Sequence, residues 1–596
     1  MSRQARPRSS SLPVFHVIQR AFPPIASALK DTWRDGYRGT QFRADLLAGI
    51  AVGIIAVPLS LALAIASGVP PQHGLYTAFI AGAVIALAGG SRFNVSGPTA
   101  AFVVILFPIA QQHGLGGLLV ATFMAGAMLI ALGWGRMGQL IQYIPYSVTT
   151  GFTAGIALVI ASLQLKDFFG LTAEGSEHFL ARIGQVFWAL PDFNPVELGV
   201  GATTLALLVL WPRLRLPGPA YLGAALFAGF AAWLIKTQFP GLTLTTIADR
   251  FSYTLDGVTH AGIPPLLPEW HWPWELPGKD GAHLELSFEL IRSLIGPAFA
   301  IALLGAIESL LCAVIADGMT GKKHDPDAEL VAQGLGNLVA PLFGGIPATG
   351  ALARTAASIR AGARSPIAAL VHALFVFTCM LTLAPLLSWL PMCGLAALLL
   401  MVAWNMSERR NFVRILRVAP RGDVLLMLSC FGLTVLVDMV VAISVGVVMG
   451  ALFFMHRMSK VSMVNLIGEG HPQAPAGLPK NARFYEIAGP LFFGAAERAM
   501  AALRNHDKSV RAVILDLSAV PTIDATGLVA LEGLIDDLNG GGIFVAVCGA
   551  QRSVLKVLRE AGYLKETGKR WYYASAEAAV KRLNESEPAP ESLPGF

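Results

Sequence analysis

The sequence predicts a polytopic α-helical membrane protein with a small α/β domain near its C-terminus. First, 54% of the 596 residues are hydrophobic and only 14% are charged, about half the charged fraction of soluble proteins. Second, residues 45–457 form an almost continuous series of apolar segments, which indicates that lipid is their solvent. Third, strand and helix patterns alternate from about residue 483 to 585, as in a soluble domain with a partly parallel sheet.

The composition also excludes several functions. The net charge of +6 is explained by Lys and Arg in cytoplasmic loops, so we expect no nucleic-acid partner. The five cysteines form no CxxC or CxxH pair, so neither a metal site nor a disulfide framework is expected. Because the sequence also lacks a Walker A motif and a Ser-His-Asp pattern, we predict that the protein is not an enzyme and uses no cofactor.

Fourteen apolar segments are predicted to cross the membrane. A crossing helix needs about 20 apolar residues, and most of the segments reach or approach that length. Their ranges are 46–66, 73–89, 97–112, 115–133, 144–165, 195–211, 218–237, 290–317, 330–343, 349–362, 366–389, 393–405, 423–439 and 440–457. Segments 97–112, 330–343 and 349–362 are short, and such segments in matching places of two halves indicate a transporter site.

The pattern divides the chain into five regions. They are a basic cytoplasmic N-terminal region (1–44), a transmembrane domain (45–460), a linker (461–482), the α/β domain (483–585) and a disordered tail (586–596). If both termini are cytoplasmic, Lys and Arg gather in the inner loops, as the positive-inside rule requires. The longer outer stretches hold only a few cations, such as Lys166, Arg182, Arg250 and Lys279. We therefore expect a multi-pass protein of the inner (plasma) membrane.

The first candidate site lies in Gly89–Leu106. Pro98 fits the first turn of a helix, because its missing N–H would be unsatisfied there. If this helix begins at mid-membrane, its free N–H groups and the hydroxyls of Ser96 and Thr99 form an anion site. An ordinary helix that begins at the membrane interface explains the same residues.

The second candidate site lies in Gly344–Pro366, which repeats the Gly-Gly and Pro pattern. Arg354 falls in the first turns of a short helix, where a cation opposes the helix dipole and a buried charge is costly. A bound anion removes this conflict. Alternatively, Arg354 reaches the cytoplasmic face, although Arg360 and Arg364 are better placed for that role.

A third feature is Glu308, a lone carboxyl inside the apolar segment 290–317. A membrane carboxyl that gains and loses a proton is typical of proton coupling. A structural hydrogen bond, or a salt bridge with Arg354, is the alternative.

Four stretches together resemble the SulP anion-transporter family, which fuses a membrane domain to a cytoplasmic STAS domain. They are VPLSLALAIASGVPPQHGLYTAFIAG, SRFNVSGPTAAF, ELVAQGLGNLVAPLFGGIPATGALART and VILDLSAVPTIDATGL. The resemblance covers about residues 30–585. It implies two inverted seven-helix repeats, arranged as a core domain that moves against a gate domain. AIESLLCAVIADGMTG and LLLMVAWNMSE look most like the bacterial branch that carries succinate, fumarate and aspartate.

The resemblance implies that the substrate lies between the N-termini of the third and tenth helices and faces the first. This places Thr99, Ala353 and Arg354 at the site. Leu59 and Leu63 of the first helix then stand where many relatives have Gln and an aromatic residue, which makes this site more apolar than one for chloride or sulphate.

The resemblance also bears on coupling and regulation. Glu308 and Cys312 fall where bicarbonate relatives have sodium ligands, but a thiol is a poor ligand for Na⁺. Proton coupling is therefore favoured over sodium coupling. In the STAS domain, Thr526 holds the place of a phosphorylated Ser in soluble anti-sigma antagonists. An inert helix N-cap turn is the alternative there.

Three functions stay open at this point. The leading hypothesis is proton-coupled uptake of four-carbon dicarboxylates by alternating access. Another anion, such as sulphate or bicarbonate, is the alternative, and a membrane sensor that signals through its STAS domain is the third. The resemblance further implies a homodimer and a cytoplasmic protein partner of the STAS domain.

Overall fold

The computed structural model describes residues 25–141, 145–172, 176, 178–215, 218–255, 257–282, 284–461, 463–467, 475–492, 510–562 and 571–585. The predicted disordered tail 586–596 and the first 24 residues of the N-terminal region lie outside these described residues. The chain divides into two compact units, Met1–Val447 and Val448–Phe596, and each is described by itself.

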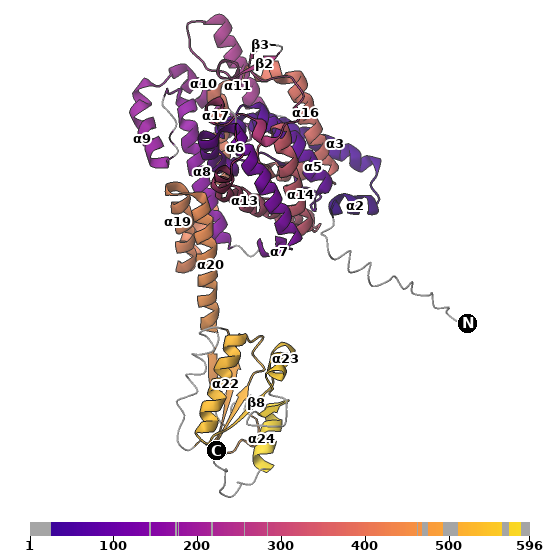
Figure 1. Cartoon of the computed structure of the whole chain (residues 1–596), viewed down its shortest axis with the longest axis vertical. Helices are drawn as coiled ribbons and strands as arrows, with labels where there is room; N and C mark the ends of the chain where they lie inside the picture. Colours follow the sequence, from indigo (N-terminus) through magenta and orange to yellow (C-terminus); the bar gives the residue numbers. More distant parts are fainter. Residues whose placement is uncertain are drawn as a thin grey trace, which may run out of the picture. The chain divides into compact units, whose positions relative to one another are not determined.

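The first unit is mainly helical (Figure 1). Its first half contains α2 (Ser27–Arg34), α3 (Gly39–Ala66), α4 (Gln72–Tyr76), η1 (Thr77–Ala81), α5 (Gly82–Ala88), β1 (Ser96–Gly97), α6 (Ala100–Trp134), α7 (Gly138–Ile141), α8 (Tyr146–Phe169), α9 (Phe179–Ala189), η2 (Leu190–Asp192), α10 (Pro195–Leu210) and α11 (Ala220–Gln238). The stretch after α11 holds α12 (Ile247–Arg250), the hairpin β2 (Ser252–Leu255) and β3 (Val258–Ala261), η3 (Pro273–Glu275) and η4 (Lys279–Gly281).

The second half of this unit again begins with long apolar helices. It contains α13 (Phe288–Thr320), α14 (Pro326–Val339), η5 (Ala340–Phe343), β4 (Thr349–Gly350), α15 (Leu352–Arg360), α16 (Ile367–Leu387), α17 (Met392–Met406), α18 (Arg409–Val418), α19 (Arg421–Leu436) and the start of α20 (Met439–Val461).

Seven described helices are each long and apolar enough to cross a membrane, namely α3, α6, α8, α11, α13, α16 and α20. The bent pair formed by α9–η2 and α10 adds an eighth if it counts as one span. Each of the fourteen predicted segments falls mainly on helix, and the neighbouring segments 97–112 and 115–133 share α6. That helix breaks at Gly114, whose φ of 70° lies outside the helical region. The fourteen-segment prediction therefore agrees with the helices of the structure.

The helices pack in two sets. In the first set, α3 packs on α16, and α6 packs on both α13 and α14. In the second set, α8 packs on α17 and α19, and α10 packs on α17. In the first set, glycines allow the backbones of α14 and α6 to approach closely. A Cβ on Gly334 of α14 would lie 2.7 Å from the carbonyl oxygen of Gly126 on α6.

The second unit contains a five-stranded sheet in the order β5 (Met463–Ile467), β6 (Ala482–Ala488), β7 (Ala512–Asp516), β8 (Phe544–Cys548) and β9 (Trp571–Tyr573). The strands β6 to β9 are parallel, and β5 pairs antiparallel with β6. β5 falls in the stretch predicted to be a linker, 461–482, so part of that stretch belongs to the sheet. Alternating strands and helices correctly predicted the partly parallel sheet.

Three helices in the described part of this unit cover the sheet, and they are α22 (Ala525–Gly540), α23 (Arg552–Glu560) and α24 (Ala576–Glu585). On one face, Leu531 of α22 and Val554 of α23 pack with Leu515 of β7. On the other face, Val580 of α24 packs with Ile514 of β7. The two apolar faces of β7 therefore each have a helical cover, as expected for a buried parallel strand.

Candidate anion site

Two short extended arms meet inside the helical unit, just before α6 and α15. β1 and β4 pair antiparallel, with Ser96 opposite Gly350 and Gly97 opposite Thr349. The arms continue this pairing, because the Ala351 amide donates to the Val95 carbonyl at 3.0 Å. The N-termini of α6 and α15 are therefore brought together. Neither helix has a side-chain N-cap hydrogen bond, so their first amide groups stay available to a ligand.

The first candidate stretch thus adopts the predicted extended-then-helical form. The helix begins at Ala100, two residues after Pro98, with Thr99 as its N-cap residue. The arm is buried, with Ser96 2% and Thr99 7% exposed, so this helix starts inside the protein rather than at its surface. The alternative of an ordinary helix starting at the interface does not describe this segment.

Polar residues of α14 hold the arms in place, and sequence reasoning missed them. Asn337 binds Ala348 twice, because its Oδ1 accepts from the Ala348 amide at 2.8 Å and its Nδ2 donates to the Ala348 carbonyl at 2.9 Å. Gln333 Nε2 donates to Ser96 Oγ at 3.0 Å. The Ser96 hydroxyl is therefore hydrogen-bonded to a side chain of α14. The signal was a set of polar residues spaced by about one turn in segment 330–343.

Glu329, at the start of the same helix face, ties the loop before β1 to α14. Its Oε2 accepts from the Gly90 and Ser91 amides, both at 3.0 Å. Its Oε1 accepts from Asn94 Nδ2 at 2.8 Å. This buried carboxylate is satisfied by neutral donors, which is how a buried charge is retained at tolerable cost.

Arg354 lies in the first turn of α15 and is buried, with 3% exposed. Its Nη2 donates to the Pro98 carbonyl of the opposite arm. Its Nε and Nη1 have no hydrogen-bond partner among the described residues. A buried guanidinium with unsatisfied donors beside two uncapped helix N-termini is suited to an anion. Because it is buried, Arg354 does not reach the cytoplasmic face.

Glu308 lies on α13 and faces the start of α6. Its Oε2 accepts a hydrogen bond from Thr99 Oγ1 at 3.0 Å. Within the described residues, no ion pair joins Glu308 to Arg354, so the salt bridge considered from the sequence is not formed. One turn further along α13, the Cys312 thiol donates to Thr355 Oγ1 at 3.2 Å. The structure therefore brings Thr99, Glu308 and Arg354 to one place.

The remaining predicted site residues form no hydrogen bond, among the described residues, with Thr99, Glu308 or Arg354. Leu59 is 9% exposed and Leu63 is 1% exposed, and both lie on α3, which packs against α15. Ala353 is exposed, unlike its buried neighbour Arg354. No cluster of three or more His, Cys, Asp or Glu side chains that could hold a metal ion occurs within the described ranges.

His372 on α16 was also missed. It is fully buried, and neither of its ring nitrogens has a hydrogen-bond partner in the part of the chain that the structure describes. It lies close enough to Arg354 for that charge to act on it. A single His in an otherwise apolar segment was the available signal.

In the second unit, Thr526 is the second residue of α22 and is exposed. Asp524 Oδ1 accepts from the Gly527 amide at 2.7 Å and caps the helix. The predicted N-cap turn is therefore formed, and the Thr526 hydroxyl is accessible.

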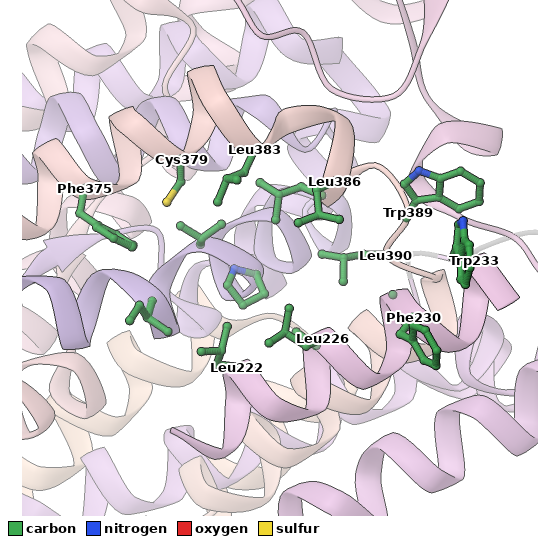
Figure 2. Close-up of a pocket in the computed structure, with 16 residues that line it drawn as sticks. Leu222, Leu226, Phe230, Trp233, Phe375, Cys379, Leu383, Leu386, Trp389 and Leu390 are labelled. Atoms are coloured by element: carbon green, nitrogen blue, oxygen red, sulfur yellow. The ribbon is translucent and has the colours of Figure 1, made fainter. Parts of the chain in front are cut away.

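A separate apolar groove lies between α3, α11 and α16 (Figure 2). Trp233, Trp389 and Phe230 lie at one end of it, and Phe375 and Cys379 lie at the other. None of the sixteen residues that line it is charged. An anion would lose its hydration there without replacement, so this groove is not the anion site.

Comparison with known proteins agrees with this architecture. The sequence profile described as the sulfate permease family matches residues 42–430, and that of the STAS domain matches residues 476–579. The chain belongs to the sulfate permease (SulP) family. The resemblance to the SulP family that the motifs predict is therefore confirmed. The family is one of transporters rather than enzymes.

Two relatives cover nearly the whole of this SulP protein. A protein of Bacillus subtilis named "Putative sulfate transporter YvdB" is 37% identical over 90% of this chain and 97% of its own length. The "Bicarbonate transporter BicA" of Picosynechococcus is 27% identical over 91% of this chain and 94% of its own length. Neither name supports the dicarboxylate branch that the motifs AIESLLCAVIADGMTG and LLLMVAWNMSE predict.

Solved structures confirm the predicted fold class. The structure of murine Slc26a9, titled as an anion transporter in the inward-facing state, matches with a TM-score of 0.81 at 19% identity, over 98% of this chain and 97% of that chain. The transmembrane domain of a cyanobacterial bicarbonate transporter, BicA, matches with a TM-score of 0.58 at 26% identity, over 68% of this chain and 98% of that chain. This SulP protein therefore has the membrane-transporter fold with a C-terminal STAS domain.

Proposed function

We propose that this protein is a secondary active transporter of small oxyanions, with sulphate or bicarbonate as its substrate, and that it works by alternating access. One observation carries the proposal: Arg354 is buried, and its Nε and Nη1 have no partner among the described residues. An oxyanion held there would accept hydrogen bonds from Arg354 and from the amides at the starts of α6 and α15. The names of the relatives favour sulphate or bicarbonate over other anions.

Four-carbon dicarboxylates, the leading substrates predicted from the sequence, become the second candidate. The relatives' names do not support them. The observation in their favour is that Leu59 and Leu63 are apolar, since such a wall suits the methylene carbons of succinate better than the oxygens of sulphate.

We propose Glu308 as the proton-coupling group. Its carboxylate meets the Thr99 hydroxyl at the N-cap of α6, so a change in its protonation alters a donor at the anion site. Ser96, Thr99 and Ala353 complete the proposed site with backbone or hydroxyl groups. Thr526 is accessible for phosphorylation at a helix N-terminus, where the added charge is tolerated.

We further propose the cellular arrangement that the charge pattern predicts. The transmembrane domain 45–460 lies in the inner (plasma) membrane, and both termini are cytoplasmic. The STAS domain 483–585 then meets a cytoplasmic protein partner, and the protein is a homodimer. A sensor function without transport is the remaining alternative.

The test is uptake of labelled sulphate, bicarbonate and succinate into proteoliposomes, with and without an inward proton gradient. We expect sulphate or bicarbonate to accumulate, and the gradient to increase uptake. Arg354→Ala should reduce uptake about 100-fold or more, because a charged hydrogen-bonding group is lost. Arg360→Ala, an exposed arginine of the same helix, is the matched control and should behave as wild type.

Three results would count against parts of this proposal. Succinate uptake without sulphate or bicarbonate uptake would establish the second candidate. Uptake that persists in Arg354→Ala would remove Arg354 from the site. If no anion moves while the full-length chain captures a cytoplasmic protein, the sensor alternative is correct.

A further inference from the structure

A small polar cavity of about 170 Å³ lies where the ends of several helices meet. Its walls come from the C-terminal ends of α3 and α8, from the middle of the first part of α6, from α9 and from Arg250. It therefore lies between α3 and α6, which belong to the helix set that carries the arms, and α8, which belongs to the other set. By the predicted topology, these ends are on the outer side of the membrane.

The lining of this cavity is strongly cationic. Its described charged residues are Lys166, Arg182, Arg250 and Asp167, which gives three positive charges against one negative charge. Asp167 Oδ1 is already bound by Arg250 Nη1 at 2.8 Å. The amides of Gln111, Gln164 and Gln185 and the hydroxyl of Ser162 add neutral hydrogen-bonding groups. Three of the four outer cations that the sequence singles out thus gather around one cavity.

Arg182 is buried and held by two hydrogen bonds. It is 6% exposed, although it lies on the exposed amphipathic helix α9. Its Nη1 donates to Ser162 Oγ at 3.1 Å, and its Nε donates to the Ser176 carbonyl at 3.1 Å. These bonds fix the guanidinium between two helices, so little rotamer freedom is lost when a ligand binds it.

Arg182 also lines a second, larger cavity of about 520 Å³, together with Phe107 and Leu163. That cavity extends along α6 to the start of α13 and to the turn between α19 and α20. From Phe107 to Thr99 the chain runs back eight residues along α6, or about 12 Å at the rise of an α-helix. The two cavities therefore share a wall along α6, and the larger one extends along this helix as far as Val104, five residues after Thr99.

We propose that this cavity is a second anion-binding site, which takes a small oxyanion from the outer side before it reaches Arg354. The cavity of about 170 Å³ has room for a small oxyanion such as sulphate or bicarbonate, which have five or four heavy atoms. Fixed cations in a low-dielectric cleft raise the local concentration of anions, which increases the rate of capture. The capture role depends on the proposed transport function, whereas the binding itself does not.

The experiment measures binding of labelled sulphate to the full-length protein in nanodiscs. Arg354→Ala removes the central site, and we expect this variant to keep about one bound sulphate per chain. Adding Lys166→Gln or Arg182→Gln to it should weaken the remaining binding at least tenfold, since a charged hydrogen-bonding group is lost. Lys166→Gln is the safer variant because its side chain is half-buried, whereas Arg182 is buried and bonded. Lys279→Gln, an exposed outer lysine away from the cavity, is the matched control.

In transport, Lys166→Gln alone should raise the external sulphate concentration for half-maximal uptake about tenfold and leave the maximal rate unchanged. Absence of sulphate binding in Arg354→Ala, or unchanged binding after Lys166→Gln and after Arg182→Gln are added to it, would overturn the second site. If no anion is transported while Arg354→Ala still binds sulphate through Lys166, the proposed function fails and the second site stands.

Discussion

Thr99 Oγ1 donates a hydrogen bond to Glu308 Oε2 at 3.0 Å, which joins the N-cap of α6 to the middle of α13. While Glu308 is ionised, it accepts this bond and holds the Thr99 hydrogen away from other acceptors. Once protonated, Glu308 needs the bond less, and the hydroxyl is free to donate to an anion at the helix N-terminus. If Glu308 is the proton-coupling group, a proton on Glu308 and an anion beside Thr99 favour each other, and such coupling is reciprocal.

Glu308→Gln is expected to remove the pH dependence of uptake, because an amide keeps the shape of the protonated carboxyl and does not titrate. The measurement is initial uptake of the best substrate from acidic to alkaline pH. Thr99→Val is the second test, since it removes the partner of Glu308 without removing the titrating group. Because Glu308 acts on the anion through this hydroxyl, Thr99→Val should weaken anion binding and also flatten the pH profile. An unaltered profile in Glu308→Gln would assign the proton to another residue.

Gly97→Ala is expected to displace the Arg354 guanidinium. A Cβ at this position would lie 2.6 Å from Arg354 Nη1 and 3.5 Å from the Ala78 Cα, so the arginine must move. We expect about tenfold to 100-fold weaker anion binding, the usual effect of losing a charged hydrogen bond. The melting temperature should also fall, because the φ of +159° at Gly97 strains an alanine there. Gly318→Ala, where the added Cβ has no neighbour within 4 Å, is the control, and equal effects of the two changes would refute this account.

Asn337→Ala is expected to destabilise the helical unit. It leaves the amide and the carbonyl of buried Ala348 without partners, at a cost of about 1–3 kcal/mol for each group. The measurement is the melting temperature of the purified protein, with substrate binding followed in parallel. Asn411→Ala removes an exposed amide from α18 and should have a small effect. A wild-type melting temperature in Asn337→Ala would show that the arm holds its shape without this bond.

The helices could be predicted from the sequence because hydropathy is a local property. All fourteen segments fall mainly on helix, and Gly114 marks the break between two of them. Strand β5 was assigned to a linker instead, because its five residues become a strand only by pairing with β6. The pairing of β1 with β4 was equally hidden, since it joins residues more than 250 positions apart.

The candidate site was predicted in part for a similar reason. Arg354 and Glu308 are lone charges in apolar segments, which makes them visible in the sequence. Asn337 and Gln333 were not recognised, because their roles depend on contacts with distant backbone at Ala348 and with Ser96. Substrate choice was the weakest prediction, since it depends on side-chain geometry that two short motifs do not specify.

Cys548 offers a test of the STAS unit within the intact protein. It is fully buried under α24, and burial raises the pKa of its thiol from 9.0 to about 12, with a smaller contribution from Asp516. Because the thiolate is the reactive form, maleimide should not label Cys548 in the folded protein at neutral pH. Thr526→Cys, exposed on the same domain, should label rapidly and shows that the reagent reaches it. Peptide mass mapping separates Cys548 from the other four cysteines.

The raised pKa of Cys548 also determines whether the STAS unit becomes more or less stable at alkaline pH. Between pH 9 and 12 the unfolded thiol loses its proton and the folded thiol keeps it. The unfolded state then binds fewer protons, so the free energy of unfolding falls as pH rises, by at most about 1.4 kcal/mol per pH unit. Labelling of Cys548 should therefore require less denaturant at alkaline pH than at neutral pH. In Cys548→Ala, this slope of STAS unfolding should become smaller, although burial also raises the pKa values of Tyr485, Tyr572 and Tyr573 and these contribute with the same sign. An unchanged slope would show that Cys548 does not contribute.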